Sequence, residues 1–185
     1  SKVPICNYLR GFEKSVKRVA QREEKLVDFL LECQEDIYIN YKEYANILSS
    51  LVHIFNNAVV HGIESQDERL ESQKSEIALV RCSVKKMEDF IHISIEDDGK
   101  GIDTKKLRAK FSNECAGKSD EEIVNLIFKD GFSTKDNIDE MSGRGVGLSA
   151  LKGEIDRICG EITVESKKGQ GVRFNIKLPK IKESA

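Results

Sequence analysis

YANILSSLVHIFNNAVVHGIES, residues 44–65, is the stretch that decides the fold. Its apolar residues recur at helical spacing and form one stripe: Ile47, Leu48, Leu51, Phe55, Ala58 and Val59. His53, Asn57 and His61 follow at four-residue intervals, so the same helix gathers them on another face. The sequence therefore predicts a helix that packs on a core, presents these polar groups and ends at Gly62 in a left-handed C-cap. A solvated face that carries an amide and two imidazoles by chance is the alternative.

Composition indicates one cytoplasmic domain with a sizeable core. The chain has 185 residues, 39% of them apolar, and its 30 basic and 32 acidic residues leave a net charge of -2. No overall field therefore favours nucleic acid or an anionic membrane. No apolar run approaches the roughly 20 residues of a membrane helix, and no signal peptide is visible, so we expect no direct membrane insertion. Because the chain begins abruptly at Ser1, we expect it to be a fragment of a longer protein.

The cysteines predict neither a disulfide framework nor a zinc site. They are scattered, odd in number and without CxxC spacing: Cys6, Cys33, Cys82, Cys115 and Cys159. We therefore expect reduced thiols, in keeping with a cytoplasmic protein.

The remaining periodic segments predict the order of helices and strands. Helical spacing is found in residues 5–22, 104–111, 119–128 and 148–158. Strand patterns are found in residues 26–32, 37–40, 77–84, 90–96, 161–165 and 172–178. Residues 66–76 have almost no apolar side chains and are predicted to be a solvated loop. Hairpins placed between helices predict an α/β (α+β) two-layer sandwich, with a mixed sheet and helices on one face.

A carboxylate and a glycine turn follow the strand at residues 90–96. Asp97 lies at the strand end, and Gly99 and Gly101 allow the backbone to turn sharply and approach a flat ligand. A carboxylate there can accept a hydrogen bond from an exocyclic amine such as that of adenine. An aspartate that only caps the turn is the alternative.

A second glycine segment precedes the helix at residues 148–158. Gly143, Gly145 and Gly147 alternate with Arg144 and Val146, so several N–H groups lie at a positive helix end and can cradle a phosphate. A plain turn is the alternative, because the segment fits neither a Rossmann fingerprint nor a Walker A loop. The long connection at 129–147 has little periodicity and is predicted to be a mobile functional loop.

Asn57 and His53 suit metal and proton chemistry. An amide oxygen can bind a hard cation, and Mg²⁺ takes most of its other ligands from water and substrate phosphates. His53, one turn earlier, can accept or relay a proton near neutral pH or orient a water.

Taken in order, five segments resemble the motifs of one family. They are HIFNNAVVHGIE at 53–64, DDGKGID at 97–103, FKDGFSTK at 128–135, SGRGVGL at 142–148 and GQGV at 169–172. Together they resemble the ATP-binding catalytic domain of histidine kinases, the GHKL or Bergerat fold, and most closely that of CheA-type chemotaxis kinases. The resemblance covers residues 1–185 as a single domain, with an N-terminal helix in 1–25 and an ATP lid at 129–147.

The resemblance implies a role for each matching residue. Asp97 would bind the adenine amine, with Gly99, Gly101 and Ile102 beside the base. Asn57 would coordinate Mg²⁺, and His53 would assist attack by the phosphoacceptor. The remaining positions would contact the phosphates: His61, Lys106, Lys110, Ser133, Thr134, Gly143, Arg144, Gly145, Val146, Gly147 and Leu148.

The implied function is a cytoplasmic protein histidine kinase of a two-component phosphorelay. It would bind ATP with Mg²⁺ and transfer the γ-phosphoryl group to a histidine on a separate domain or protein, with a response regulator downstream. A homodimer formed through regions outside this chain stays open. Two alternatives remain: a nucleotide-binding module without kinase activity, because Val60 and Asn56 depart from the CheA pattern, and an ATP-gated conformational ATPase.

Overall fold

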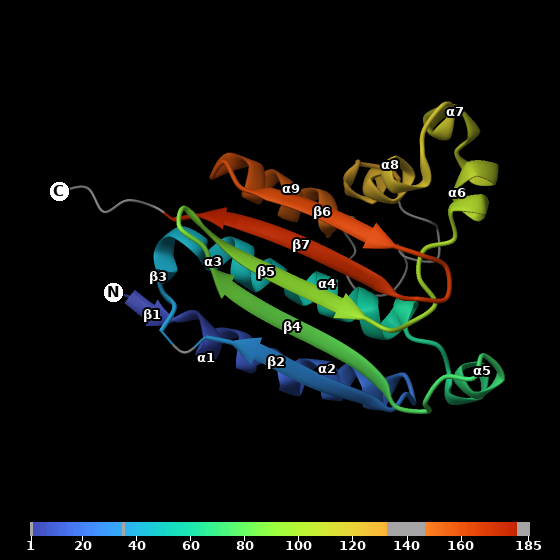
Figure 1. Cartoon of the computed structure of the whole chain (residues 1–185), viewed down its shortest axis with the longest axis horizontal. Helices are drawn as coiled ribbons and strands as arrows, with labels where there is room; N and C mark the ends of the chain where they lie inside the picture. Colours follow the sequence, from blue (N-terminus) through green and yellow to red (C-terminus); the bar gives the residue numbers. More distant parts are fainter. Residues whose placement is uncertain (1, 35, 133–146, 181–185) are drawn as a thin grey trace.

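A five-stranded mixed sheet carries helices on one face (Figure 1). The computed structural model describes residues 2–34, 36–132 and 147–180. The strand order is β2-β4-β5-β7-β6, where β2 and β4 run parallel and the other neighbours antiparallel. The strands are β2 Val27–Cys33, β4 Ala78–Lys86, β5 Phe90–Asp97, β6 Glu161–Ser166 and β7 Val172–Pro179. The predicted α/β sandwich is confirmed.

Strict alternation along the strands explains why only one face is covered. In β5, Ile91, Ile93 and Ile95 are buried between residues that are only half-buried. On the outer face opposite charges lie on neighbouring strands: Arg81 Nη1 is 3.4 Å from Glu96 Oε1, and Arg173 Nη2 is 2.7 Å from Glu96 Oε2. The outer face is thus solvated, and ion pairs between neighbouring strands lie on it.

Among the described residues, five helices and one π-helical turn make up the second layer. They are α1 Ile5–Arg10, α2 Phe12–Arg22, α3 Tyr41–Ser50, α4 Val52–Asn57, η1 Ala58–Gly62 and α9 Leu148–Arg157. The predicted apolar stripe is buried, with Ile47, Leu48, Leu51, Phe55 and Val59 at most 2% exposed. Within the described residues, no helix is long and apolar enough to cross a membrane.

Three short elements of the described part of the chain were not predicted from the sequence, whereas the strand predicted at residues 37–40 is present. Strand β1, Lys2–Pro4, pairs antiparallel with β3, Tyr38–Asn40, in a separate two-stranded sheet. Helix α7 is Ser112–Cys115, and helix α5, Gln66–Glu71, lies inside the segment predicted to be a loop. The loop prediction is wrong for residues 66–71, because Ser65 opens a capping box in which its Oγ accepts from the Glu68 N–H at 3.2 Å. Residues 72–76 have no helix or strand, as predicted.

A second, smaller core lies beside the main one. It contains Leu107, Cys115, Ile123 and Phe132, held by α6 Thr104–Lys110, α7, α8 Asp120–Val124 and the 3₁₀ turn η2 Asn125–Phe128. The side-chain amide of Asn125 donates to the carbonyl oxygen of Val164 at 3.1 Å and accepts from its N–H at 3.0 Å. Strand β6 is the last of the sheet, so this amide covers part of a free sheet edge.

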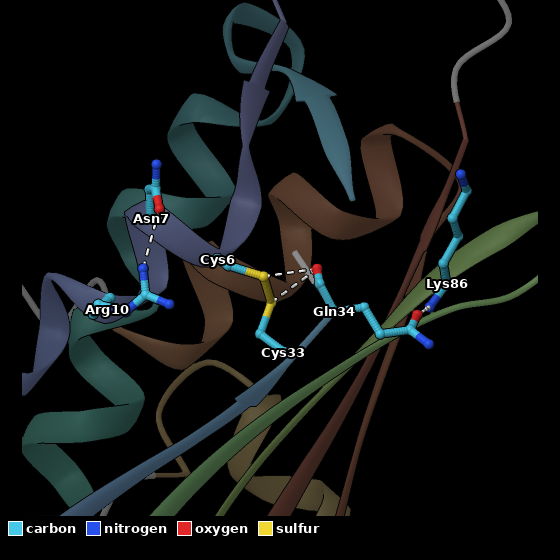
Figure 2. The surroundings of a disulfide bond; sticks show 6 residues. All are labelled: Cys6, Asn7, Arg10, Cys33, Gln34 and Lys86. Carbon is cyan, nitrogen blue, oxygen red and sulfur yellow. Dashed lines mark hydrogen bonds between the residues drawn. A yellow bond between two sulfur atoms is a disulfide. The ribbon is translucent and has the colours of Figure 1, made fainter. Parts of the chain in front are cut away.

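The expectation of reduced thiols is wrong for one pair of cysteines. Cys6 in α1 and Cys33 at the end of β2 form a disulfide with an S–S distance of 2.03 Å (Figure 2). The two residues are 27 positions apart in sequence, and only the packing of α1 against the sheet brings them together. Cys82 and Cys115 are buried free thiols, and Cys159 is an exposed one.

Reducing this disulfide should lower the free energy of unfolding by about 3 kcal/mol, because the bond closes a loop in the unfolded chain. Urea unfolding with and without dithiothreitol measures the difference. The variant Cys6→Ser should match the reduced protein and ignore the reductant, whereas Cys159→Ser should keep the wild-type response. Equal stability of oxidised and reduced wild type would show that the bond contributes nothing.

Candidate functional site

The organising helix, as we call α3, α4 and η1 together, ends against the carboxylate of Asp97 at the end of β5. A β carbon at Gly62 would lie 3.2 Å from both carboxylate oxygens of Asp97, and the Lys100 N–H donates to the Gly62 carbonyl at 2.8 Å. The predicted left-handed C-cap is wrong, because Gly62 has no positive φ and Ile63 after it is extended. A side chain at Gly62 would press on the Asp97 carboxylate, so glycine here leaves that carboxylate room.

The turn after β5 depends on two glycines. The Gly99 N–H donates to Asp97 Oδ1 at 2.8 Å, and a β carbon at Gly99 would lie 2.1 Å from the Gly62 carbonyl oxygen. Gly101 has a φ of +73°, and a β carbon there would lie 2.3 Å from the carbonyl oxygen of Lys167. Backbone from three parts of the chain therefore converges on this turn.

The third part is the turn between β6 and β7. Gly171 has a φ of +81°, and a β carbon on it would lie 1.9 Å from the carbonyl oxygen of Asp97. Ser166 Oγ accepts from the Ile102 N–H at 2.8 Å and donates to the Gly171 carbonyl at 2.9 Å. Ser166 was not predicted to belong to the site, because no sequence pattern links a strand-end serine to a turn 64 residues away.

The carboxyl group of Asp97 has a raised pKa. It is 9% exposed, and its burial raises the pKa to about 7, with Asp98 and Glu64 adding to the effect. The Gly99 N–H opposes that shift by favouring the charged form. Asp97 can therefore gain or lose a proton near neutral pH and, when ionised, accept a hydrogen bond from a ligand amine.

The polar ladder of the organising helix, formed by His53, Asn57 and His61, keeps regular α-helical spacing only in part. His53 and Asn57 in α4 and His61 in η1 are all half-buried. The π turn is closed by the Ile63 N–H, which donates to the Ala58 carbonyl at 2.8 Å. Because a π turn is wider than an α turn, His61 departs from the line that joins His53 to Asn57.

A half-buried lysine caps the π turn. Lys25 Nζ donates to the carbonyl oxygens of Val59 at 2.7 Å and Val60 at 3.0 Å. Burial lowers the pKa of Lys25. Carbonyls near a helix end need such partners, so Lys25 stabilises this end of the helix beside the site. No sequence pattern indicates this contact, because Lys25 lies 34 and 35 positions from its two partners.

A magnesium ion here would not depend on a cage of protein ligands. Among the described residues, no group of three or more His, Cys, Asp or Glu side chains could hold a metal ion. The half-buried amide of Asn57 fits the alternative, in which protein supplies one oxygen and the remaining ligands are water and phosphate oxygens.

The remaining residues predicted to contact the nucleotide lie in several separate places. Lys106 and Lys110 lie exposed on α6, where Lys110 Nζ is 5.3 Å from the centre of the Phe111 ring. Ile102 packs against both cores, and Leu148, just after Gly147, packs against the main core. Six predicted residues lie outside the described part of the chain: Ser133, Thr134, Gly143, Arg144, Gly145 and Val146.

Asp97 also borders a cavity of about 560 Å³. Ser166, Lys167, Gly171 and Asn125 contribute to its lining, whereas Asn57 does not. The cavity thus adds open space beside Asp97 but does not by itself unite the carboxylate with the polar ladder.

Comparison with known proteins places these features in one family. The family model for histidine kinase-, DNA gyrase B-, and HSP90-like ATPases matches residues 47–182. The gliding motility regulatory protein of Myxococcus xanthus is 35% identical over 184 residues, which is 96% of this chain and 24% of that protein. Chemotaxis protein CheA of Borreliella burgdorferi is 37% identical over 182 residues, 96% of this chain and 21% of that protein. The chain thus spans about a quarter of the length of these relatives.

Solved structures share the fold at lower identity. The nucleotide-free catalytic domain of histidine kinase ThkA superposes with a TM-score of 0.60 at 20% identity, covering 97% of this chain and 95% of that one. The mycobacterial sensor histidine kinase MprB gives a TM-score of 0.57 at 16% identity, covering 97% and 96%. The architecture is therefore that of histidine kinase catalytic domains.

Proposed function

Because the chain belongs to the histidine kinase-, DNA gyrase B-, and HSP90-like ATPase family, we propose that it is the ATP-binding catalytic domain of a CheA-like histidine kinase. It binds Mg-ATP and transfers the γ-phosphoryl group to a histidine on a separate domain or protein. The observation that carries the proposal is the convergence of Gly62, Gly99 and Gly171 on Asp97. Gly62 and Gly99 leave room beside the Asp97 carboxylate, and Gly171 leaves room beside the backbone carbonyl of the same residue.

Each proposed role follows from the chemistry of the group. Asp97 accepts a hydrogen bond from the adenine amine, and Gly101 leaves the adjacent turn free of side chain. Asn57 offers its amide oxygen to the magnesium ion, which when bound neutralises phosphate charge. His53 accepts or relays a proton as the acceptor imidazole attacks. The new P–N bond forms as the bond to the β–γ bridging oxygen breaks, and ADP leaves.

The partners and setting belong to the same proposal. A phosphoacceptor histidine domain receives the phosphoryl group, and a response regulator takes it further. The supporting relatives are a gliding motility regulatory protein and chemotaxis proteins, all much longer than this chain. We propose that residues 1–185 form one such domain within a longer cytoplasmic kinase, whose dimer contacts lie in other segments.

His53→Gln should separate binding from transfer. Glutamine keeps a polar side chain on this half-buried face but cannot take a proton, so ATP affinity should stay near wild type while transfer falls about 100-fold. Titration calorimetry with Mg-ATP gives the affinity, and transfer of labelled γ-phosphate to phosphoacceptor domains of CheA proteins gives the rate. Transfer that survives intact would leave His53 with a purely structural role. Binding without transfer in wild type would favour the module without kinase activity.

A further inference from the structure

Arg69 is a buried cation in the segment between the organising helix and β4. The residue is 1% exposed, and its guanidinium donates to Glu64 Oε1 at 2.9 Å and to Asp98 Oδ2 at 3.0 Å. Two further contacts reach carbonyl oxygens, that of Asp98 at 3.2 Å and that of Ser75 at 2.6 Å. Because all three nitrogens of the guanidinium donate, the cost of burying this charge is offset.

Lys74 brings a second cation to the same place. Its Nζ donates to Glu64 Oε2 at 2.7 Å and to the carbonyl oxygens of Asp98 at 3.1 Å and Gly99 at 2.8 Å. Burial alone would raise the pKa of Glu64, but the hydrogen bond from Lys74 and the charges of Lys74 and Arg69 hold it below its ordinary value. Glu64 therefore stays ionised. We call Arg69, Lys74, Glu64 and Asp98 the cluster, which remains charged at neutral pH.

The cluster forms hydrogen bonds with the turn at Asp98 and Gly99, which orients Asp97. The carbonyl of Gly99 accepts from Lys74, while the Gly99 N–H donates to Asp97 Oδ1 at 2.8 Å. The carboxylate of Asp98 is fixed at its other oxygen by the Leu79 N–H, at 2.9 Å. Since the residues on both sides of the Asp98–Gly99 peptide are held in this way, any shift of the cluster moves the donor that orients Asp97.

We propose that Arg69 and Lys74 are positioning residues for the adenine-binding carboxylate of Asp97, an inference that rests on the function proposed above. They act through the backbone of Asp98 and Gly99. Their effect therefore falls on recognition of the base and is the same for any adenine ligand. A lysine that binds phosphate would instead affect ATP and leave adenosine unchanged.

Lys74→Gln is the variant that tests the inference. The Lys74 side chain is 20% exposed and Glu64 keeps Arg69 as a partner, so the fold should survive. Arg69→Gln would leave Glu64 buried without that partner and is expected to cost much of the stability. Titration calorimetry of the whole chain with adenosine and with Mg-ATP should show both dissociation constants raised by the same factor, about tenfold. Lys74→Arg should restore both, and Lys14→Gln, at an exposed lysine of α2, should change neither.

The outcomes are distinct. A Lys74→Gln variant that loses affinity for ATP but keeps it for adenosine would make Lys74 a phosphate contact and overturn the inference. Unchanged affinity for both ligands, or a loss that Lys74→Arg does not restore, would overturn it as well. If Asp97→Asn still binds adenosine like wild type, the adenine assignment fails, and with it the proposed function rather than the cluster alone.

Discussion

Asp97→Asn is expected to raise the dissociation constant for ATP by about 100-fold or more. Asparagine removes the charge that accepts from the adenine amine, and the Gly99 N–H already occupies Oδ1. If the amide oxygen keeps that bond, the amide NH₂ faces the ligand, donor against donor. Calorimetry with Mg-ATP measures the loss, and circular dichroism checks that the variant is folded. Asp156→Asn, an exposed change on α9, should bind like wild type.

The pKa of Asp97 gives this prediction a pH dependence. A pKa raised from 3.8 to about 7 means that the folded protein holds a proton that the unfolded chain has lost. The stability due to this group is therefore present at acid pH and disappears as the pH rises through about 7. An adenine amine favours the ionised form, so binding near pH 7 should release part of a proton and strengthen as the pH rises. Calorimetry in buffers of different ionisation enthalpy measures that release, which Asp97→Asn should abolish.

Gly171→Ala should destabilise the fold by about 3 kcal/mol or more. The added methyl group would lie 1.9 Å from the carbonyl oxygen of Asp97, and the φ of +81° is itself unfavourable for alanine. Both strands at the Asp97–Val172 pairing must move to relieve the clash, so ATP binding should be lost together with stability.

The same turn provides a matched control. Gly169 has a φ of +83°, but a β carbon there would meet nothing within 4 Å. Gly169→Ala should therefore cost only the backbone term, about 1 kcal/mol. Urea unfolding measures the free energy of unfolding of both variants. The difference between them separates the cost of the clash at Gly171 from the cost of the backbone conformation alone. Equal losses would mean that the contact between Gly171 and Asp97 carries no weight.

The fold and the centre of the site were largely predictable, because they depend on local signals. Periodicity located the organising helix. The glycines near Asp97 lie against the backbone of Gly62 and Lys167, and the approach of this turn to a flat ligand stays a prediction. The partners of Arg69 were not predictable, since Asp98 lies 29 residues away and residues 66–76 show no apolar pattern. The Cys6–Cys33 bond was missed for the same reason: proximity arises only after the sheet and α1 have packed. The roles assigned to residues 133–146 stay predictions, because that segment lies outside the described chain.

The amide of Asn125 has a consequence for how the protein meets its own copies. It occupies both hydrogen-bonding groups of Val164 midway along the outermost strand. A strand from a second molecule would have to displace that side chain before it could pair with β6. The Asn125 amide therefore opposes extension of the sheet between molecules at this edge. Asn125→Ala would expose the edge of β6, and concentrated solutions of this variant should aggregate sooner than those of the wild-type protein.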